Sequence, residues 1–321
     1  MKLAIDAMSG DLGSAPVVEA CKKFAEKHPD VELYVTGKKE ELTALESINS
    51  IHIVDARDVV LMTDSVLGVR RKKESSMVKA LMMARKDEVD SVVSCGSTGA
   101  FYTASMLIVK RIEGVEKSCL MATLPTYSGN STCLMDVGAN ATNTAEQLQE
   151  FAVMGSLYSK LVLNKENPKV ALLNIGAEDH KGDEMHQEAY KLLKDSDKIN
   201  FTGNVEGRDL LSGDIDVIVT DGFSGNIALK ASEGAAILLM KAMKESLFAT
   251  LRGKIGALFA KPQLYALKER FDYKSVGGAL FMGFEKAIVK AHGGSDAKAV
   301  FNAMELVYRM VDLDVVGRMK E

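Results

Sequence analysis

The sequence predicts an α/β fold in three layers (αβα), with helices on both faces of a mainly parallel sheet. Two observations predict it: short apolar segments rich in β-branched residues, and longer amphipathic segments that alternate with them. The strand-like segments are 2–6, 32–37, 51–56, 91–96, 169–176, 199–204 and 216–222. The helical patterns include 16–28, 76–87, 145–162 and 184–195, and from about 226 onward the chain is expected to be helical. We therefore expect 1–321 to form a single α/β unit with a helical C-terminal region.

Composition and charge indicate an ordinary globular protein. Charged residues make up 26% of the chain and the formal net charge is −4, so binding to nucleic acid is not expected. The apolar segment before Asp6 is too short for a signal peptide, and no apolar run reaches the roughly 18–20 residues of a spanning helix. The four cysteines lie far apart without a CxxC pair, which argues against zinc and disulfides and favours a cytoplasmic protein.

Polar, glycine-rich segments follow four of the predicted strands, at 5–16, 94–100, 174–184 and 220–226. Ligands bind beyond the carboxyl ends of parallel strands, and glycine lets backbone N–H groups close around an anion. Each segment alone is compatible with an ordinary capped turn, but four at one expected edge of the sheet favour an anion site. The candidate residues are Asp6, Gly10, Ser94, Gly96, Ser97, Thr98, Gly99, Asp221, Gly222, Gly225 and Asn226.

Two cationic features accompany these segments. Lys230 would lie in the early turns of the helix after 220–226, where a cation opposes the helix dipole by about 0.3–1 kcal/mol unless an anion is bound there. A lysine on a solvated helix face is the alternative. The basic run 70–73 includes Arg71, Lys72 and Lys73. Both residue types suit phosphate, although a solvated turn is the usual origin of such a run.

Other chemistries have weaker support. No strand is followed by GxGxxG with an acidic residue about 20 positions on, and no GxxxxGK[ST] motif occurs, which weakens nicotinamide-dependent and P-loop functions. The acidic and histidine side chains of 179–186 suit a hydrated loop better than one metal ion. Cys95 lies in the predicted strand exit 94–100, but no histidine is paired with it locally, so a nucleophilic role is not favoured. We expect neither a metal nor a cofactor.

The segment 245–281 combines apolar and basic residues at helical spacing on both sides of Pro262. Two short basic amphipathic helices of this kind can lie on an anionic membrane, bind an acidic protein or pack at a subunit interface. The pattern leaves these three alternatives open. The candidate contact residues are Leu251, Lys254, Ile255, Leu258, Phe259 and Leu264.

Nine segments carry a further signal by their order along the chain: DAMSGD, RRKKESSM, SCGSTGA, MDVGAN, FAVMGSLY, LLNIGAE, FTGNVEGRD, DGFSGNIALKASEG and GGALFMG. Together they resemble the bacterial phosphate acyltransferases of phospholipid synthesis, the PlsX family, over about 2–311. Family members usually have glycine where Ser9 stands, asparagine where Ser97 stands and alanine where Gly68 stands. We therefore expect the individual contacts at these positions to differ, and the assignment to hold.

The resemblance implies an activity: transfer of a fatty acyl group from acyl-(acyl carrier protein) to inorganic phosphate, which gives acyl phosphate for phospholipid synthesis. It also implies a fold similar to phosphotransacetylases and to the isocitrate/isopropylmalate dehydrogenases. The enzyme would be a cytoplasmic homodimer, associated peripherally with the inner face of the cell membrane, and 1–321 would be its single catalytic unit.

The strand exits and the resemblance together predict a site. Ser94, Ser97, Thr98 and the backbone of 222–226 would hold phosphate, which attacks the thioester directly once it is oriented. Charge would be neutralised by Lys181, Lys230 and one of the cations of 70–73, and Asp6 or Asp221 would orient these groups. The acidic carrier protein would contact 245–281 or 70–73, and alternatively 245–281 would contact the bilayer.

Three other functions compete with this one. A phosphotransacetylase acting on acyl-coenzyme A would share the anion site and differ in the thiol donor. A decarboxylating dehydrogenase would need nicotinamide binding and normally a divalent metal held by aspartates. A non-enzymatic scaffold at the membrane would use 245–281 and would leave the four glycine-rich strand exits without a purpose.

Overall fold

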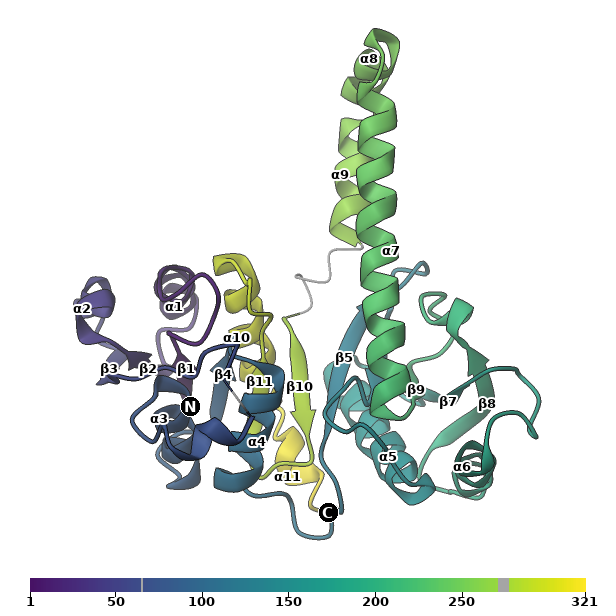
Figure 1. The fold of residues 1–321 in the computed structure, drawn as a ribbon, viewed down its shortest axis with the longest axis horizontal. Coiled ribbons are helices and arrows are strands. Elements are labelled where there is room, and N and C mark those ends of the chain that lie inside the picture. The colour runs from purple at the N-terminus through teal and green to yellow at the C-terminus, as the bar shows by residue number, and fades with distance from the viewer. Residues whose placement is uncertain (65, 271–276) are drawn as a thin grey trace.

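A mixed sheet of 11 strands forms the body of the molecule (Figure 1). The computed structural model describes residues 1–64, 66–270 and 277–321. The strand order is β3-β2-β1-β4-β11-β10-β5-β6-β9-β7-β8. Antiparallel pairing is confined to β11–β10, β10–β5 and β5–β6, and all other neighbouring pairs are parallel. The prediction of an α/β fold with a mainly parallel sheet is therefore confirmed.

The sheet has two halves that run in opposite directions. The N-terminal half contains the parallel strands β1 (Lys2–Asp6), β2 (Glu32–Gly37), β3 (Ile51–Asp55), β4 (Ser91–Ser94) and β11 (Ala287–Lys290). The C-terminal half contains β6 (Ser131–Met135), β7 (Lys169–Asn174), β8 (Asn200–Glu206) and β9 (Val217–Val219). Between them lie β10 (Ala279–Met282) and β5 (Cys119–Pro125). Because three successive antiparallel pairs join the halves, the strand direction is reversed from one half to the other.

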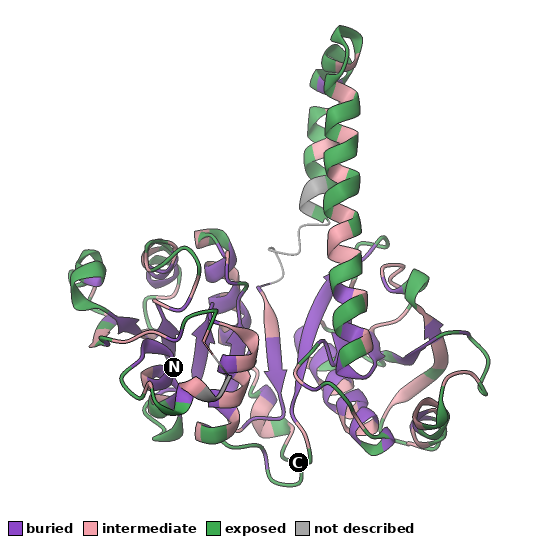
Figure 2. Ribbon diagram, in the orientation of Figure 1, coloured by how far each residue is buried: buried purple, intermediate pink, exposed green. Residues whose placement is uncertain are grey.

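Helices cover both faces of the sheet, which gives the three predicted layers. One core contains residues of α1 (Ala15–Lys27), α5 (Ala145–Val162), α6 (Glu184–Lys194) and α10 (Ala297–Asp312). The other contains residues of α3 (Ser76–Arg85), α4 (Thr98–Ile108) and the start of α7 (Gly222–Phe248). Between these layers the central strands are buried almost throughout (Figure 2).

Local signals in the sequence explain where several helices begin. Thr144 and Gln147 form a reciprocal capping box at the start of α5. The side chain of Ser75 accepts a hydrogen bond from the Val78 N–H at the start of α3, and Asp221 caps α7 in the same way. The shorter elements are α2 (Lys39–Leu42), α11 (Val315–Arg318) and the 3-10 turns η1 (Thr43–Leu45), η2 (Val66–Arg70) and η3 (Gly207–Asp209).

The structure corrects two parts of the predicted element list. Strands β5 and β6 were not expected, because they form an antiparallel hairpin that departs from the strand–helix alternation. The prediction of helix from 226 onward is correct for α7, α8 (Leu251–Phe259) and α9 (Lys261–Arg270), but β10 and β11 then return to the centre of the sheet. Within the predicted segment 245–281, residues 271–276 lie outside the described chain.

Three helices project beyond the body as one arm (Figure 1). Helix α7 starts within the body, where Leu229 is buried, and extends outward over 27 residues. Helices α8 and α9 follow at its outer end, and all three helices line one groove. The arm is largely exposed, in contrast to the sheet beneath it (Figure 2).

Candidate functional site

The exits of β1, β4 and β11 converge at one edge of the N-terminal half. Asp6 is buried at the end of β1 and accepts hydrogen bonds from the hydroxyls of Ser76 and Ser94, each at 2.6 Å. The Ser94 hydroxyl in turn accepts from the N–H of Gly96 at 3.0 Å. The hydroxyl proton of Ser94 is thus directed to Asp6, and this network fixes the loop that leads into α4.

Glycine is needed where these loops touch. A Cβ on Gly10 would lie 2.9 Å from the Cβ of Cys95, and one on Gly96 would lie 2.9 Å from the Cβ of Ser9. The Asp11 N–H donates to the carbonyl oxygen of Gly293 at 2.9 Å, which joins the first loop to the one after β11. The Ser9 hydroxyl is buried without a hydrogen-bond partner among the described residues.

The start of α4 has the character of an anion site. Ser97 occupies the N-cap position and makes no side-chain capping hydrogen bond. Thr98 and Gly99 form the first turn, and all three residues are partly exposed. The N–H groups of a first helical turn and nearby hydroxyls are donors that suit a phosphate group.

Lys290 is the feature of this edge that sequence reasoning missed. It ends β11 directly beside Ser94 in the register, and only 8% of the residue is exposed. Its ammonium donates to the carbonyl oxygen of Ala291. Burial, with a smaller contribution from the charge of Lys230, lowers the pKa of Lys290 to about 8. Lys290 was missed because its strand was not predicted: the segment KAIVKAHGG falls in a stretch that was expected to be helical.

Lys230 approaches this edge from α7, in the other half of the molecule. Its charge lowers the pKa of Lys290 and that of His292, although burial is the larger cause for both. The Lys230 ammonium also pairs with Glu233 at 2.7 Å. The predicted cation therefore lies near Lys290 and His292, two turns beyond the start of its helix.

The start of α7 forms a second cluster. The Asp221 carboxylate accepts from the Ser224 N–H at 2.9 Å and lies 3.9 Å from the imidazole of His186. A Cβ on Gly222 would lie 1.9 Å from the carbonyl oxygen of Asn140, and one on Gly225 would lie 2.0 Å from that of Asp136. These two glycines allow α7 to begin in contact with the loop after β6.

The prediction that all four strand exits share one edge is wrong. The exits of β1 and β4 lie at one edge, whereas those of β7 and β9 lie at the other, because the C-terminal half of the sheet is reversed. Helix α4 connects the two regions: its Tyr102 hydroxyl donates to the Asn140 side chain at 3.2 Å. Ser94, Ser97 and Thr98 thus belong to the first edge, and Gly222, Gly225 and Asn226 to the second.

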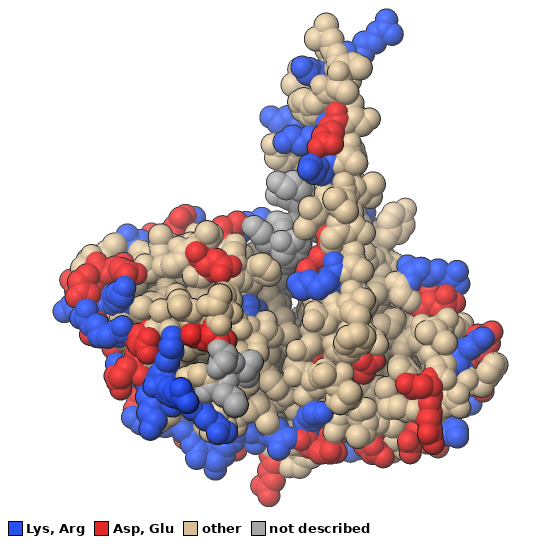
Figure 3. All heavy atoms as spheres, in the orientation of Figure 1, with Lys and Arg blue, Asp and Glu red and all other residues tan. Residues whose placement is uncertain are grey.

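The remaining predicted cations are divided as well. Lys181 lies in the loop between β7 and α6, near His186 and the start of α7, and its carbonyl oxygen accepts from the Asn174 side chain. Lys72 is held locally by Asp64 at 2.7 Å and by the carbonyl oxygen of Val59. Arg71 and Lys73 are exposed, and Figure 3 shows Lys and Arg side chains gathered on the lower left of the body.

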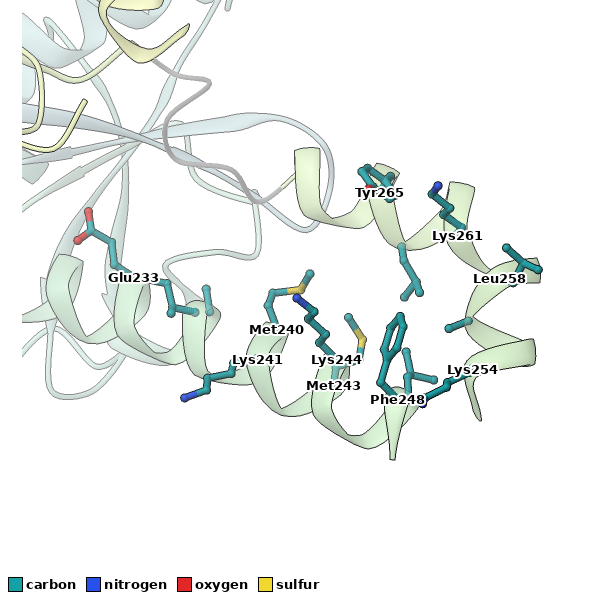
Figure 4. A pocket seen from close by; sticks show the side chains of 15 residues that line it. Glu233, Met240, Lys241, Met243, Lys244, Phe248, Lys254, Leu258, Lys261 and Tyr265 are labelled. Atoms are coloured by element: carbon teal, nitrogen blue, oxygen red, sulfur yellow. The ribbon is translucent and has the colours of Figure 1, made fainter. Parts of the chain in front are cut away.

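The arm carries most of the predicted contact residues at its outer end. Leu251, Leu258 and Phe259 are 75%, 69% and 80% exposed. Ile255 and Lys254 are exposed as well, whereas Leu264 is partly buried. A groove of about 770 Å³ runs between α7, α8 and α9, with apolar walls and lysines at its margins (Figure 4). No helix in the described chain is long and apolar enough to span a bilayer.

Solved structures of phosphotransacetylases and of dehydrogenases share this architecture. A phosphotransacetylase from Staphylococcus aureus superposes with a TM-score of 0.61 at 16% identity, covering 97% of this chain and 94% of that one. A 4-hydroxythreonine-4-phosphate dehydrogenase from Klebsiella pneumoniae superposes with a TM-score of 0.51 at 10% identity, covering 96% and 97%. At these identities the likeness shows the fold alone, which is one shared with dehydrogenases.

The sequence comparison defines the family. A phosphate acyltransferase from Exiguobacterium is 44% identical over 324 residues, which cover 100% of this chain and 98% of its relative. The family model described as "Fatty acid synthesis protein" matches residues 1–318. The chain therefore belongs to this family of phosphate acyltransferases, and it is an acyltransferase.

Proposed function

We propose that this acyltransferase takes its fatty acyl group from acyl carrier protein and transfers it to inorganic phosphate. The observation that carries the proposal is the full-length similarity to phosphate acyltransferases, together with the cationic edge formed by Lys290 and Lys230. The reaction converts a thioester and HPO₄²⁻ into acyl phosphate and a free thiol. The proton of the phosphate ends on the thiol, so the reaction needs no cofactor.

Phosphate attacks the thioester directly in this proposal. Burial raises the pKa of the Cys95 thiol to about 12, so Cys95 is a neutral thiol at physiological pH and a poor nucleophile. The attack then depends on holding phosphate beside the thioester carbonyl. The donors at the start of α4, Ser97 and Thr98, would hold the phosphate, and Lys230 would neutralise its charge.

The second cluster has a supporting role. Asp221 caps α7, and Asp6 accepts from Ser76 and Ser94, so both aspartates would orient other groups and would not be ligands of the phosphate. Gly222, Gly225 and Asn226 would place α7, and hence Lys230, relative to the first edge. Lys181 would lie at this second cluster and would act on the substrate only if the thioester extends that far.

We also propose that the arm is the peripheral membrane contact. Exposed apolar residues at its tip, with lysines nearby, are typical of segments that enter an anionic interface. The exposed residues Ile237, Leu238 and Leu239 lie closer to the body, on the shaft of α7, and an apolar surface of this kind suits the homodimer interface. In this proposal the enzyme is a cytoplasmic homodimer that delivers acyl phosphate at the inner face of the membrane.

Phosphate-dependent thiol release tests the central proposal. Palmitoyl-(acyl carrier protein) and palmitoyl-coenzyme A are compared with and without phosphate, and free thiol and acyl phosphate are both measured. Release that requires phosphate and favours the carrier protein supports the proposal. Preference for coenzyme A would make the enzyme a phosphotransacetylase, and no release from either substrate would overturn both functions.

A further inference from the structure

Lys290 is a buried cation without a carboxylate partner in the described part of the chain. Its ammonium donates a hydrogen bond to a backbone carbonyl oxygen, that of Ala291. Burying an ammonium group without an ion pair costs stability. A group that is held in this way at the exit edge of a sheet is a candidate for chemistry. By contrast, Lys286, which directly precedes β11, pairs with Asp87 at 2.8 Å.

The groups that face Lys290 come from each loop at this edge and from α7. Cys95 follows β4, Asp11 follows β1, and Lys230 lies on α7. Besides burial, which is the main cause of its lowered pKa, Lys290 is subject to the charges of Lys230 and Asp11. His292 is two residues further along its own loop and accepts a hydrogen bond from the Gly294 N–H at 3.1 Å. The Cys95 thiol is neutral and provides no counterion, and the charges of Asp11 and Lys230 oppose each other. Lys290 is therefore left without a dominant neighbouring charge.

We propose that Lys290 is a catalytic residue that donates a proton to the sulfur atom of the departing thiol. This inference rests on the proposed function. The phosphate-binding residues would hold the attacking phosphate, whereas Lys290 would protonate the departing sulfur. Ser94, which lies directly beside Lys290, is not available for it because its hydroxyl proton is directed to Asp6.

The atoms balance as follows. A phosphate oxygen forms a bond to the thioester carbonyl carbon, and the carbon–sulfur bond then breaks with its electron pair on sulfur. The sulfur takes a proton from the Lys290 ammonium, which becomes a neutral amine. The amine regains the proton that HPO₄²⁻ brought to the reaction. Each turnover therefore returns Lys290 to its starting state without an additional acid.

The acidity of Lys290 suits this step. A proton donor is most effective when its pKa is close to that of the acceptor and to the working pH. The pKa of Lys290 is about 8 because of its burial, and the ordinary pKa of the cysteine thiol, which is also an alkyl thiol, is about 8.5. An ordinary solvated lysine, with a pKa near 10.4, would be a weaker acid by about two units.

Three substitutions and two leaving groups test the proposal. Lys290→Met removes the charge and the proton, and Lys290→Arg keeps the charge but cannot release a proton. Lys286→Met, at the residue that precedes the same strand, is the matched control. Each is assayed with phosphate and decanoyl thioesters of pantetheine and of 4-nitrothiophenol. The aryl thiol leaves as a stable thiolate and needs no proton. Circular dichroism and thermal unfolding establish that each variant is folded.

With the pantetheine ester we expect both Lys290 variants to lose about 10²- to 10⁴-fold in kcat/KM. With the aryl ester the loss should fall to about 10-fold or less, and Lys286→Met should match the wild type. At a fixed concentration of HPO₄²⁻, the wild-type kcat/KM should be constant below pH 8 and decrease above it as the amine loses its proton, and Lys290→Met should lack this decrease.

Two results would overturn the assignment. Near-normal activity of Lys290→Arg with the pantetheine ester would show that only the charge matters. Equal losses with the two esters would show that Lys290 positions the substrate and does not protonate sulfur. If the wild type releases no thiol in the presence of phosphate, the proposed function itself fails, and that result is separate from either outcome for the variants.

Discussion

The ammonium of Lys290 should reduce the stability of the fold at neutral pH. Its pKa is about 8 in the folded protein against an ordinary value of 10.5, so the unfolded chain binds more protons between these values. Stability should therefore rise with pH across this window. The burial penalty is fully present below pH 8 and is absent above about pH 10.5.

This penalty predicts that Lys290→Met is more stable than the wild type at pH 7, by about 2 kcal/mol. The gain should shrink between pH 8 and 10.5, since the wild-type lysine becomes neutral there. Urea unfolding at several pH values measures it, with Lys286→Met as the control that loses an ion pair. A Lys290→Met variant that is less stable at pH 7 would contradict the assignment of a buried, unpaired charge.

The glycines of α7 differ in what surrounds them, and this allows a matched pair of substitutions. A Cβ on Gly225 would meet the backbone carbonyl of Asp136 at 2.0 Å, whereas a Cβ on Gly234 would have nothing within 4 Å. We expect Gly225→Ala to destabilise the protein by about 3 kcal/mol because backbone must move. Gly234→Ala should stabilise it by about 0.5–1 kcal/mol through helix propensity. Similar effects for both in urea unfolding would be inconsistent with this packing.

The elements show which parts of the fold the sequence could predict. Segments with a strong period and a cap, such as α5 with its Thr144 box, were predicted at the bounds that the structure gives. The hairpin β5–β6 and the late strands β10 and β11 were not predicted, because their antiparallel pairing departs from the strand–helix alternation on which the prediction rested. In addition, β10 pairs with β5, which is distant in sequence, and local pattern contains no information about such a pairing.

The same limit applies to the site. The strand exits at Ser94 and Asp221 were predicted from local glycine and polar content, but their separation was not, because it follows from the reversed half of the sheet. Lys290 was missed because it ends a strand that was itself missed. Which of these residues contact phosphate stays a prediction.

At the level of the arm, we predict that the double variant Leu258→Ser/Phe259→Ser binds anionic vesicles about 10- to 100-fold more weakly than the wild type. Both side chains are exposed, so their loss removes apolar contact with lipid. Vesicle flotation measures binding, with Leu107→Ser on the exposed side of α4 as control. Turnover of a soluble thioester should be retained. Unchanged flotation together with a changed mass in light scattering would identify the tip as a subunit interface instead.

For the whole molecule, the net charge is −4, but the basic run 70–73 forms a local positive surface. We predict that an acidic carrier protein docks at this surface. Arg71→Glu/Lys73→Glu should raise KM for palmitoyl-(acyl carrier protein) by about 10-fold at low salt, and the difference should narrow as salt screens the charges. Lys198→Glu, an exposed residue elsewhere, is the control.

The carrier-free substrate palmitoyl-pantetheine separates two explanations of such a rise. Its KM should not change, since it has no acidic surface for these side chains to attract. A parallel rise for both substrates would place Arg71 and Lys73 at the phosphate site and not at the carrier surface.

Helix α7 connects the second cluster, the first edge and the tip in one rigid element. Its first turn is clamped where Gly222 and Gly225 touch backbone, Lys230 lies about 12 Å further along, and Phe248 lies about 39 Å along the axis. If the helix tilts as one unit about its first turn, the displacement of each residue is proportional to its distance from that turn. A sideways displacement of the tip would reach Lys230 reduced to about one third, so a shift of 3 Å at the far end corresponds to about 1 Å beside Lys290.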